Sequence, residues 1–248
     1  MELWQIILLM FIGIFAGWLN VMAGGGSLFT VPAMLFMEIP APVANGTNRI
    51  AILAQNTTAV YTFYRKGFSD FKLGLSLSLA ASVGALGGAF VGVELQGVWF
   101  DRVLALVMIV VMIIMASGKS SSPHVADNGP AKNLLLGHIC MVGAGFWGGF
   151  IQIGVGFILM PILHRVMGFN LVRVNMYKVL VVLSYTVVAL AVFASQLELM
   201  WWAGLGLAVG NSIGGWYGAH TTVHKGESWI KVVMYVALSA MIIKLLLF

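Results

Sequence analysis

AGGGSLFTVP, residues 23–32, interrupts an apolar run that begins at Leu3. Three glycines break what would otherwise be one membrane helix, and apolar residues then resume up to a proline. As a single helix, residues 3–36 would be about 50 Å long, whereas the hydrocarbon core of a bilayer is about 30 Å thick. We therefore expect a broken helix whose chain turns back at the glycines and leaves on the side where it entered.

The composition identifies the class of protein. Of the 248 residues, 60% are hydrophobic and 8% charged, and the mean hydropathy is +1.00, whereas soluble domains carry about 25% charged residues. Because backbone in lipid must satisfy its own hydrogen bonds, we expect an all-α integral membrane protein. The bases lie in short loops, which argues against a nucleic-acid partner. The expected helices are residues 4–22, 25–37, 43–64, 72–96, 98–117, 133–151, 153–165, 172–194, 199–222 and 228–247.

The chain reads as two repeats, residues 1–117 and 133–248, joined by the polar linker 118–132. A shift of 129 residues aligns Pro32 with Pro161 and Arg49 with Lys178. A further slip of three residues aligns two ladders of glycines, which we assign to close helix packing because small residues at this spacing let helices approach in lipid. The ladders are Gly84, Gly88, Gly92 and Gly210, Gly214, Gly218. Duplicated membrane halves are typical of secondary transporters.

The positions of the bases favour inverted repeats, each a broken-helix hairpin followed by three transmembrane helices. Under inversion, nine of the thirteen bases share one face, and a parallel repeat would divide them almost evenly. Cytoplasmic loops carry the excess of Lys and Arg, so we expect the linker in the cytoplasm and both termini outside. The nine are Arg65, Lys66, Lys72, Lys119, Lys132, Arg165, Arg173, Lys225 and Lys231.

Arg49 and Lys178 lie inside apolar segments with no acid to pair them. A charge at the bilayer centre costs about 2.5 to 3.5 kcal/mol on insertion scales, so two at equivalent positions need a reason. One alternative is that both side chains reach an interface. The other is a small-anion site between the halves, faced also by the bare amides of Gly24, Gly25 and Gly26. A purely structural hinge at these glycines stays open.

Polar side chains gather near the two bases, and their amide and hydroxyl donors suit an oxyanion. Helix capping explains Asn45 and Thr47 equally well, and interhelical hydrogen bonding explains Gln152. The expected substrate-binding residues besides the bases and Gly24 to Gly26 are Asn45, Thr47, Asn48, Gln152, Gly154, Gly156, Asn175 and Tyr177.

Catalytic and metal sites are not expected. The GGGS stretch lacks the Gly-Lys-Ser/Thr of a phosphate-binding loop, and no His, Cys, Asp or Glu set has ligand spacing. We therefore expect no enzyme activity, no cofactor and no metal, and we assign the single cysteine, Cys140, to packing.

The segments GWLNVMAGGGSLFTVPAMLFMEIPAPVANGTNRIAIL and GFWGGFIQIGVGFILMPILHRVMGFNLVRVNMYKVL resemble the two copies of the TauE/SafE sulfite exporter motif over nearly the whole chain. Gly-Val-Gly in the second copy departs from the glycine run, as does its helix start Asn-Met-Tyr-Lys. The matching residues are Gly24, Gly25, Gly26, Pro32, Gly46 and Thr47, with Gly154, Gly156 and Pro161 in the second copy.

The resemblance implies a carrier in the inner membrane that exports sulfite or an organosulfonate by alternating access. Proton coupling and a homodimer are further expectations. An anion channel of the same fold and a non-transporting membrane scaffold stay open as alternatives.

Overall fold

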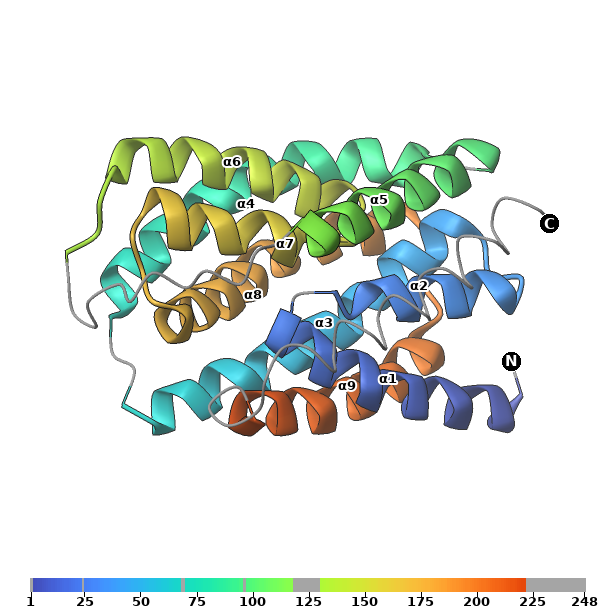
Figure 1. Ribbon diagram of the computed structural model, residues 1–248. Helices are drawn as coiled ribbons and strands as arrows, with labels where there is room; N and C mark the ends of the chain where they lie inside the picture. The colour runs from blue at the N-terminus through green and yellow to red at the C-terminus, as the bar shows by residue number, and fades with distance from the viewer. Residues whose placement is uncertain (1, 24, 68–69, 96, 118–129, 222–248) are drawn as a thin grey trace.

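The computed structural model describes residues 2–23, 25–67, 70–95, 97–117 and 130–221 (Figure 1). This part of the chain is all-α, with no strand. The expected helix 228–247, the C-terminus and residues 118–129 of the linker lie outside the described residues. The first half contains α1 (Leu3–Ala23), α2 (Ser27–Phe36), α3 (Ala41–Arg65), α4 (Phe71–Glu94) and α5 (Val98–Ser117). The second contains α6 (Leu134–Phe150), α7 (Val155–Pro161), the π-helical turn η1 (Ile162–Val166), α8 (Leu171–Gln196) and α9 (Trp201–Thr221).

Helix ends follow local chemistry. The Asn170 side chain caps α8 by accepting a hydrogen bond from the Arg173 amide at 2.8 Å, as side-chain oxygens do at helix N-termini. Pro40 is the N-cap of α3 and Pro42 lies in its first turn, where the missing amide hydrogen costs nothing. The predicted breaks of both hairpins are confirmed, because α1 and α2 are separate helices, as are α6 and α7.

The two glycine ladders pack helices of one half against helices of the other. A Cβ at Gly84 or Gly88 of α4 would lie 1.9 Å from a carbonyl oxygen of α6, and one at Gly210 or Gly214 of α9 would lie 2.0 Å from a carbonyl oxygen of α1. No side chain fits at these distances, so glycine allows backbone-to-backbone contact. The packing role predicted for both ladders is confirmed.

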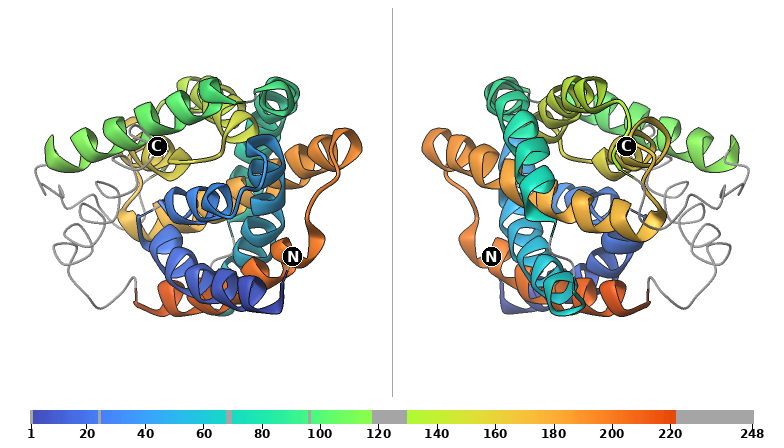
Figure 2. Two further views of the ribbon diagram at one scale, coloured as in Figure 1. Left: turned by 90° about the vertical axis from the view of Figure 1, so that its right-hand side faces the viewer. Right: turned by 90° about the vertical axis from the view of Figure 1, so that its left-hand side faces the viewer.

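The contacts between the halves follow a reciprocal pattern. α1 packs on α9 and α6 packs on α4, while α3 contacts α9 and α8 contacts α4. α3 and α8 also contact each other. One side of the bundle consists mainly of α4, α5 and α6, and the opposite side consists of α1 and α9. Between the two sides lie α2, α3, α7 and α8 (Figures 1 and 2). The equivalent helices α1 and α6 run in opposite directions, as do α3 and α8 (Figure 1).

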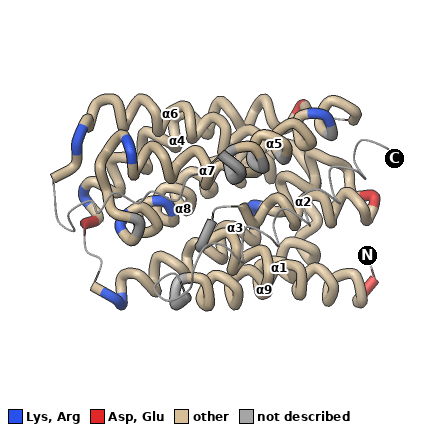
Figure 3. Tube along the Cα trace, viewed as in Figure 1, with Lys and Arg blue, Asp and Glu red and all other residues tan. Residues whose placement is uncertain are grey.

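Among the described residues, three helical segments are long and apolar enough to cross a membrane: Leu3–Val21, Phe71–Glu94 and Val172–Gln196. Figure 3 shows most Lys and Arg residues gathered at one end of the long helix bundle and most Asp and Glu residues at the other. The bundle is therefore a multi-pass membrane protein with an unequal distribution of charge between its two ends.

Candidate functional site

The break between α1 and α2 depends on a close approach of the two helices. A Cβ at Gly26 would lie 2.3 Å from the carbonyl oxygen of Ala16. The φ of Gly26 is −58°, which any residue adopts, so packing rather than backbone freedom requires glycine here. The side-chain oxygen of Asn20 accepts a hydrogen bond from the Gly26 amide at 3.4 Å and joins the two helices.

The break between α6 and α7 uses left-handed backbone instead. Gln152 has a φ of 61° and Gly154, the N-cap of α7, a φ of 72°. This region suits glycine but costs an ordinary side chain about 1 to 2 kcal/mol. The indole nitrogen of Trp147 donates to the carbonyl oxygen of Ile153 at 3.0 Å and ties the turn to α6. The turn therefore holds a residue other than glycine, Gln152, in strained backbone.

Arg49 of α3 is fully buried and binds the other half of the protein. Its Nη1 donates to the Gly148 carbonyl oxygen at 2.9 Å and its Nη2 to the Gly149 carbonyl oxygen at 2.5 Å, both in the last turn of α6. Its guanidinium carbon lies 4.4 Å from the centroid of the Phe193 ring. The arginine therefore holds the C-terminus of the broken helix α6.

Lys178 of α8 makes the reciprocal contact. Its Nζ donates to the carbonyl oxygens of Val21 at 2.9 Å and Asn20 at 3.4 Å, in the last turns of α1, and to the Asn175 side chain at 2.8 Å. The side chain is 3% exposed and Arg49 is 0% exposed. The alternative that both bases reach an interface is therefore wrong.

A small internal cavity lies where the two breaks meet. It leaves a volume of about 10 Å³ for the centre of a water molecule, which is room for about one water. Apolar side chains line part of the cavity, and polar side chains and main-chain atoms line the rest. That wall consists of Asn20, Ser27, Asn56, Gln152, Gly156 and Lys178.

The polar groups of the wall are only partly satisfied within the described residues. Nε2 of Gln152 donates to the Thr186 hydroxyl at 3.3 Å, whereas its Oε1 is buried without a described partner. Nδ2 of Asn56 donates to its own helix at the Ile52 carbonyl oxygen. The amide of Gln152 can therefore present a hydrogen-bonding group to the cavity, and which of its two atoms does so depends on the amide orientation.

Several predicted site residues lie beside the cavity rather than on its wall. Asn48 binds the hydroxyls of Thr30 and Ser27 in α2 at 2.6 and 3.2 Å. Thr47 accepts from the Met200 amide at the start of α9 at 3.1 Å. Asn48 therefore holds α2, and Thr47 holds the start of α9, beside the cavity.

The other predicted residues divide in the same way. Asn45 donates to the Phe150 carbonyl oxygen at 2.8 Å, and Asn175 accepts from Lys178. Gly25 and Gly26 are buried at the first break, whereas Gly24 lies outside the described residues. Gln152 and Gly156 alone among the other predicted residues share the cavity wall with Lys178, and Gly154 lies beside them at the start of α7.

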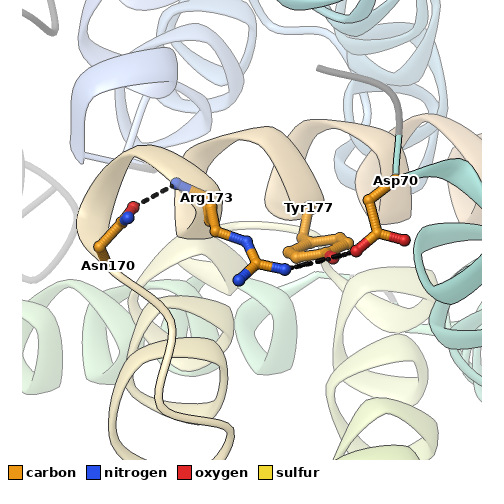
Figure 4. Close-up of polar contacts among 4 residues, drawn as sticks. All are labelled: Asp70, Asn170, Arg173 and Tyr177. Carbon is orange, nitrogen blue, oxygen red and sulfur yellow. Dashed lines mark hydrogen bonds and ion pairs between the residues drawn. The ribbon is translucent and has the colours of Figure 1, made fainter. Parts of the chain in front are cut away.

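Tyr177 belongs to a different cluster, drawn in Figure 4. Its hydroxyl donates to the carboxylate of Asp70, which also forms an ion pair with Arg173 at 3.4 Å. Arg173 lies over the ring of Phe169, 4.7 Å from its centroid. The cluster joins the connection between α3 and α4 to the first turns of α8, and so lies apart from the cavity.

The cavity wall also includes Ser27, Asn20 and Asn56, which sequence reasoning did not assign to the site. Ser27 is the first residue of α2, and Val155 and Gly156 begin α7. The sequence signal that could have identified these residues is their position at the start of the helix that follows each break. In the described part of the chain, no three His, Cys, Asp or Glu residues are grouped as a metal site would require.

Comparisons with known proteins extend over almost the whole chain. Residues 9–245 match the family model described as sulfite exporter TauE/SafE. A probable membrane transporter protein, ORF9, of a Sinorhizobium species is 25% identical over 93% of this chain and 88% of its own length. A probable membrane transporter protein of Haemophilus influenzae is 23% identical over 89% of this chain and 86% of its own. The probable membrane transporter protein YfcA of Escherichia coli K12 is 22% identical over 96% and 88%. No solved structure matches significantly.

Proposed function

Because this chain belongs to the sulfite exporter TauE/SafE family of membrane transporters, we propose that it is a secondary carrier that exports sulfite or an organosulfonate. The proposed binding site is the central cavity, with Lys178, Asn20, Ser27, Asn56, Gln152 and Gly156 on its wall. Asn45, Asn48, Thr47 and Asn175 support it from the surrounding helices.

One observation carries this proposal: the starts of both half-helices and a buried lysine meet at one cavity. Ser27 opens α2, and Val155 and Gly156 open α7. The N-terminus of a helix carries about half a positive charge and amides without intrahelical partners. Two such ends and the ammonium of Lys178 form a positive centre, and none of the described residues that line the cavity is Asp or Glu. Such a centre favours an anion over a metal cation.

The size of the cavity supports a mechanism of alternating access. Its volume admits about one water, and a sulfur oxyanion has several non-hydrogen atoms. A substrate therefore requires the walls to separate, and the breaks beside α2 and α7 are the points at which the halves can move. Opening first toward one face and then toward the other would carry the anion across.

The arrangement of the helices supports two inverted repeats, residues 1–117 and 133–248. Equivalent helices run in opposite directions (Figure 1) and exchange contacts reciprocally. The gathering of Lys and Arg at one end supports placing that end, with the linker, in the cytoplasm of a cell whose inner membrane holds the protein (Figure 3). The N-terminus then lies outside the cell. The C-terminus, which we also expect outside, belongs to residues that the structure does not describe.

The test is counterflow in proteoliposomes. Vesicles loaded with unlabelled sulfite should accumulate labelled sulfite faster than vesicles loaded with a neutral solute, because a carrier exchanges one bound anion for another. Vesicles without protein are the control, and sulfonates and carboxylates form the comparison panel. Flux that follows the electrochemical gradient without acceleration by internal anion would indicate a channel. Absence of flux for every anion would overturn the transport proposal.

Proton coupling and a homodimer stay predictions. A pH gradient imposed on the same vesicles tests the first, since coupled transport should change with the direction of the gradient. Light scattering of the purified protein tests the second.

A further inference from the structure

Two side chains of α3 donate hydrogen bonds to carbonyl groups at the C-terminal end of α6. The last four carbonyl groups of an α-helix have no partner within the helix. In α6, the Trp147 carbonyl accepts from the amides of the turn that follows, at 3.0 and 3.2 Å. The other three accept from two side chains of α3. The bonds run from Arg49 to Gly148 and Gly149, at 2.9 and 2.5 Å, and from Asn45 to Phe150, at 2.8 Å.

We propose that Arg49 and Asn45 are positioning residues that cap the C-terminus of α6 across the two halves, and that only Lys178 brings a full charge to the anion. The inference rests on the proposed function in one respect, which is that the central cavity is the anion site. It changes the role expected for Arg49 and Asn45 from substrate binding to holding one wall of that site.

The surroundings of Arg49 leave little room for it to bind an anion. Each terminal nitrogen donates to a carbonyl oxygen, Nη2 also donates to the Asn45 side-chain oxygen at 3.5 Å, and Phe193 covers the guanidinium 4.4 Å away. Its Nε is buried without a described partner, yet Arg49 is not among the residues that line the cavity. The rigid fork of the guanidinium gives each of the two carbonyl groups its own nitrogen, at 2.9 and 2.5 Å, whereas the single ammonium of Lys178 reaches its equivalent pair at 2.9 and 3.4 Å.

The segment held by this cap leads directly to the cavity. Ile151 to Gly154 follow the capped carbonyls, and Gln152 within them stands on the cavity wall in left-handed backbone. If the end of α6 is released, the position of the Gln152 amide and the start of α7 should loosen together. Arg49 thus acts on the anion through the turn and not by contact.

Lys178 occupies the equivalent position with a different outcome. It also caps carbonyl groups, those of Asn20 and Val21 in α1, but it lines the cavity as well. Its bond to the Asn20 carbonyl oxygen is long, at 3.4 Å, and is the one that an anion would replace. The two bases of the repeat have therefore diverged into a positioning residue and a binding residue.

The test compares Arg49→Lys, Arg49→Gln and Asn45→Ala with Lys178→Gln in the full-length protein. Without any anion, the first three should lower Tm by about 5 °C or more and accelerate hydrogen exchange selectively in residues 151–156. With sulfite as the probe, they should lower the maximal transport rate while KM stays within about twofold of wild type. Lys178→Gln should raise KM about tenfold or more, as loss of a charge-assisted bond does. Arg49→Lys keeps the positive charge, yet residues 151–156 should still exchange faster in it than in the wild type.

The results that overturn the inference are distinct from failure of the transport proposal. A tenfold rise in KM with unchanged Tm in Arg49→Gln would make Arg49 a ligand. Unchanged exchange in residues 151–156 of Asn45→Ala would remove the capping role, and this milder variant serves if Arg49→Gln does not fold. If the wild type binds no anion, the Tm and exchange measurements still decide whether the cap exists.

Discussion

Replacing Gly88 of α4 by alanine should push α4 and α6 apart. The same change at the neighbouring Gly87 should leave the two helices in contact. A Cβ at Gly88 would lie 1.9 Å from the Phe146 carbonyl oxygen and 2.8 Å from the Phe150 amide nitrogen, whereas one at Gly87 meets only the Phe146 ring at 3.8 Å. Both changes gain about 1 kcal/mol of helix propensity, so the gain cancels in the comparison. The clash is with backbone and costs about 1 to 3 kcal/mol. Gly88→Ala should therefore be less stable than Gly87→Ala by that amount.

Thermal unfolding in detergent, followed by the near-ultraviolet signal of the tryptophans, measures this difference. About 1 to 3 kcal/mol corresponds to a Tm lower by roughly 2 to 12 °C in a protein of this size. The second half offers a repeat of the comparison on α6, where a Cβ at Gly145 would lie 1.9 Å from the Ala81 carbonyl oxygen and one at Gly143 meets nothing within 4 Å. Equal Tm values in both pairs would refute the close backbone contact between α4 and α6 and, with it, the packing role of Gly88.

Three further changes have different expected results. Asp70→Asn removes the ion pair with Arg173. The Asp70 side chain is 43% exposed and that of Arg173 22%, so the free energy of unfolding should fall by less than about 1 kcal/mol. A larger loss in chemical denaturation would contradict this weak contribution. Gln152→Gly should be more stable than Gln152→Ala by about 1 kcal/mol, because glycine relieves the left-handed backbone; both should bind sulfite more weakly in calorimetry, and equal Tm values would contradict the strain. Thr47→Val leaves the partly buried Met200 amide without its acceptor and should cost about 1 kcal/mol in thermal unfolding. An unchanged Tm would show that the bond contributes nothing.

The helices could be predicted from the sequence because lipid leaves little choice. An apolar run must be helical at membrane depth, so the expected segments 43–64 and 72–96 match α3 and α4 within a few residues. The glycine ladders could be assigned to packing because their spacing places them on one helix face. Their partners could not be predicted, since α4 packs mainly on α6 and α8, which are distant in the chain, and much less on α3.

The site was predictable only in part. Arg49 and Lys178 stood out because charge is costly in lipid, but their partners are main-chain carbonyls of distant helices, which no side-chain pattern reveals. Tyr177 adjoins Lys178 in sequence yet binds Asp70, since successive residues of a helix point in different directions. Ser27 was overlooked because its importance comes from its position as the first residue of α2.

The anion site is tested most directly by the affinity of the purified protein for sulfite with and without the Lys178 ammonium. Isothermal titration should give binding by the wild type and by Lys72→Gln, which removes an exposed base from the start of α4. Lys178→Gln should bind about 10- to 100-fold more weakly, because a charge-assisted hydrogen bond is worth about 1.5 to 3 kcal/mol. Equal affinity in wild type and folded Lys178→Gln would contradict an anion site in the central cavity.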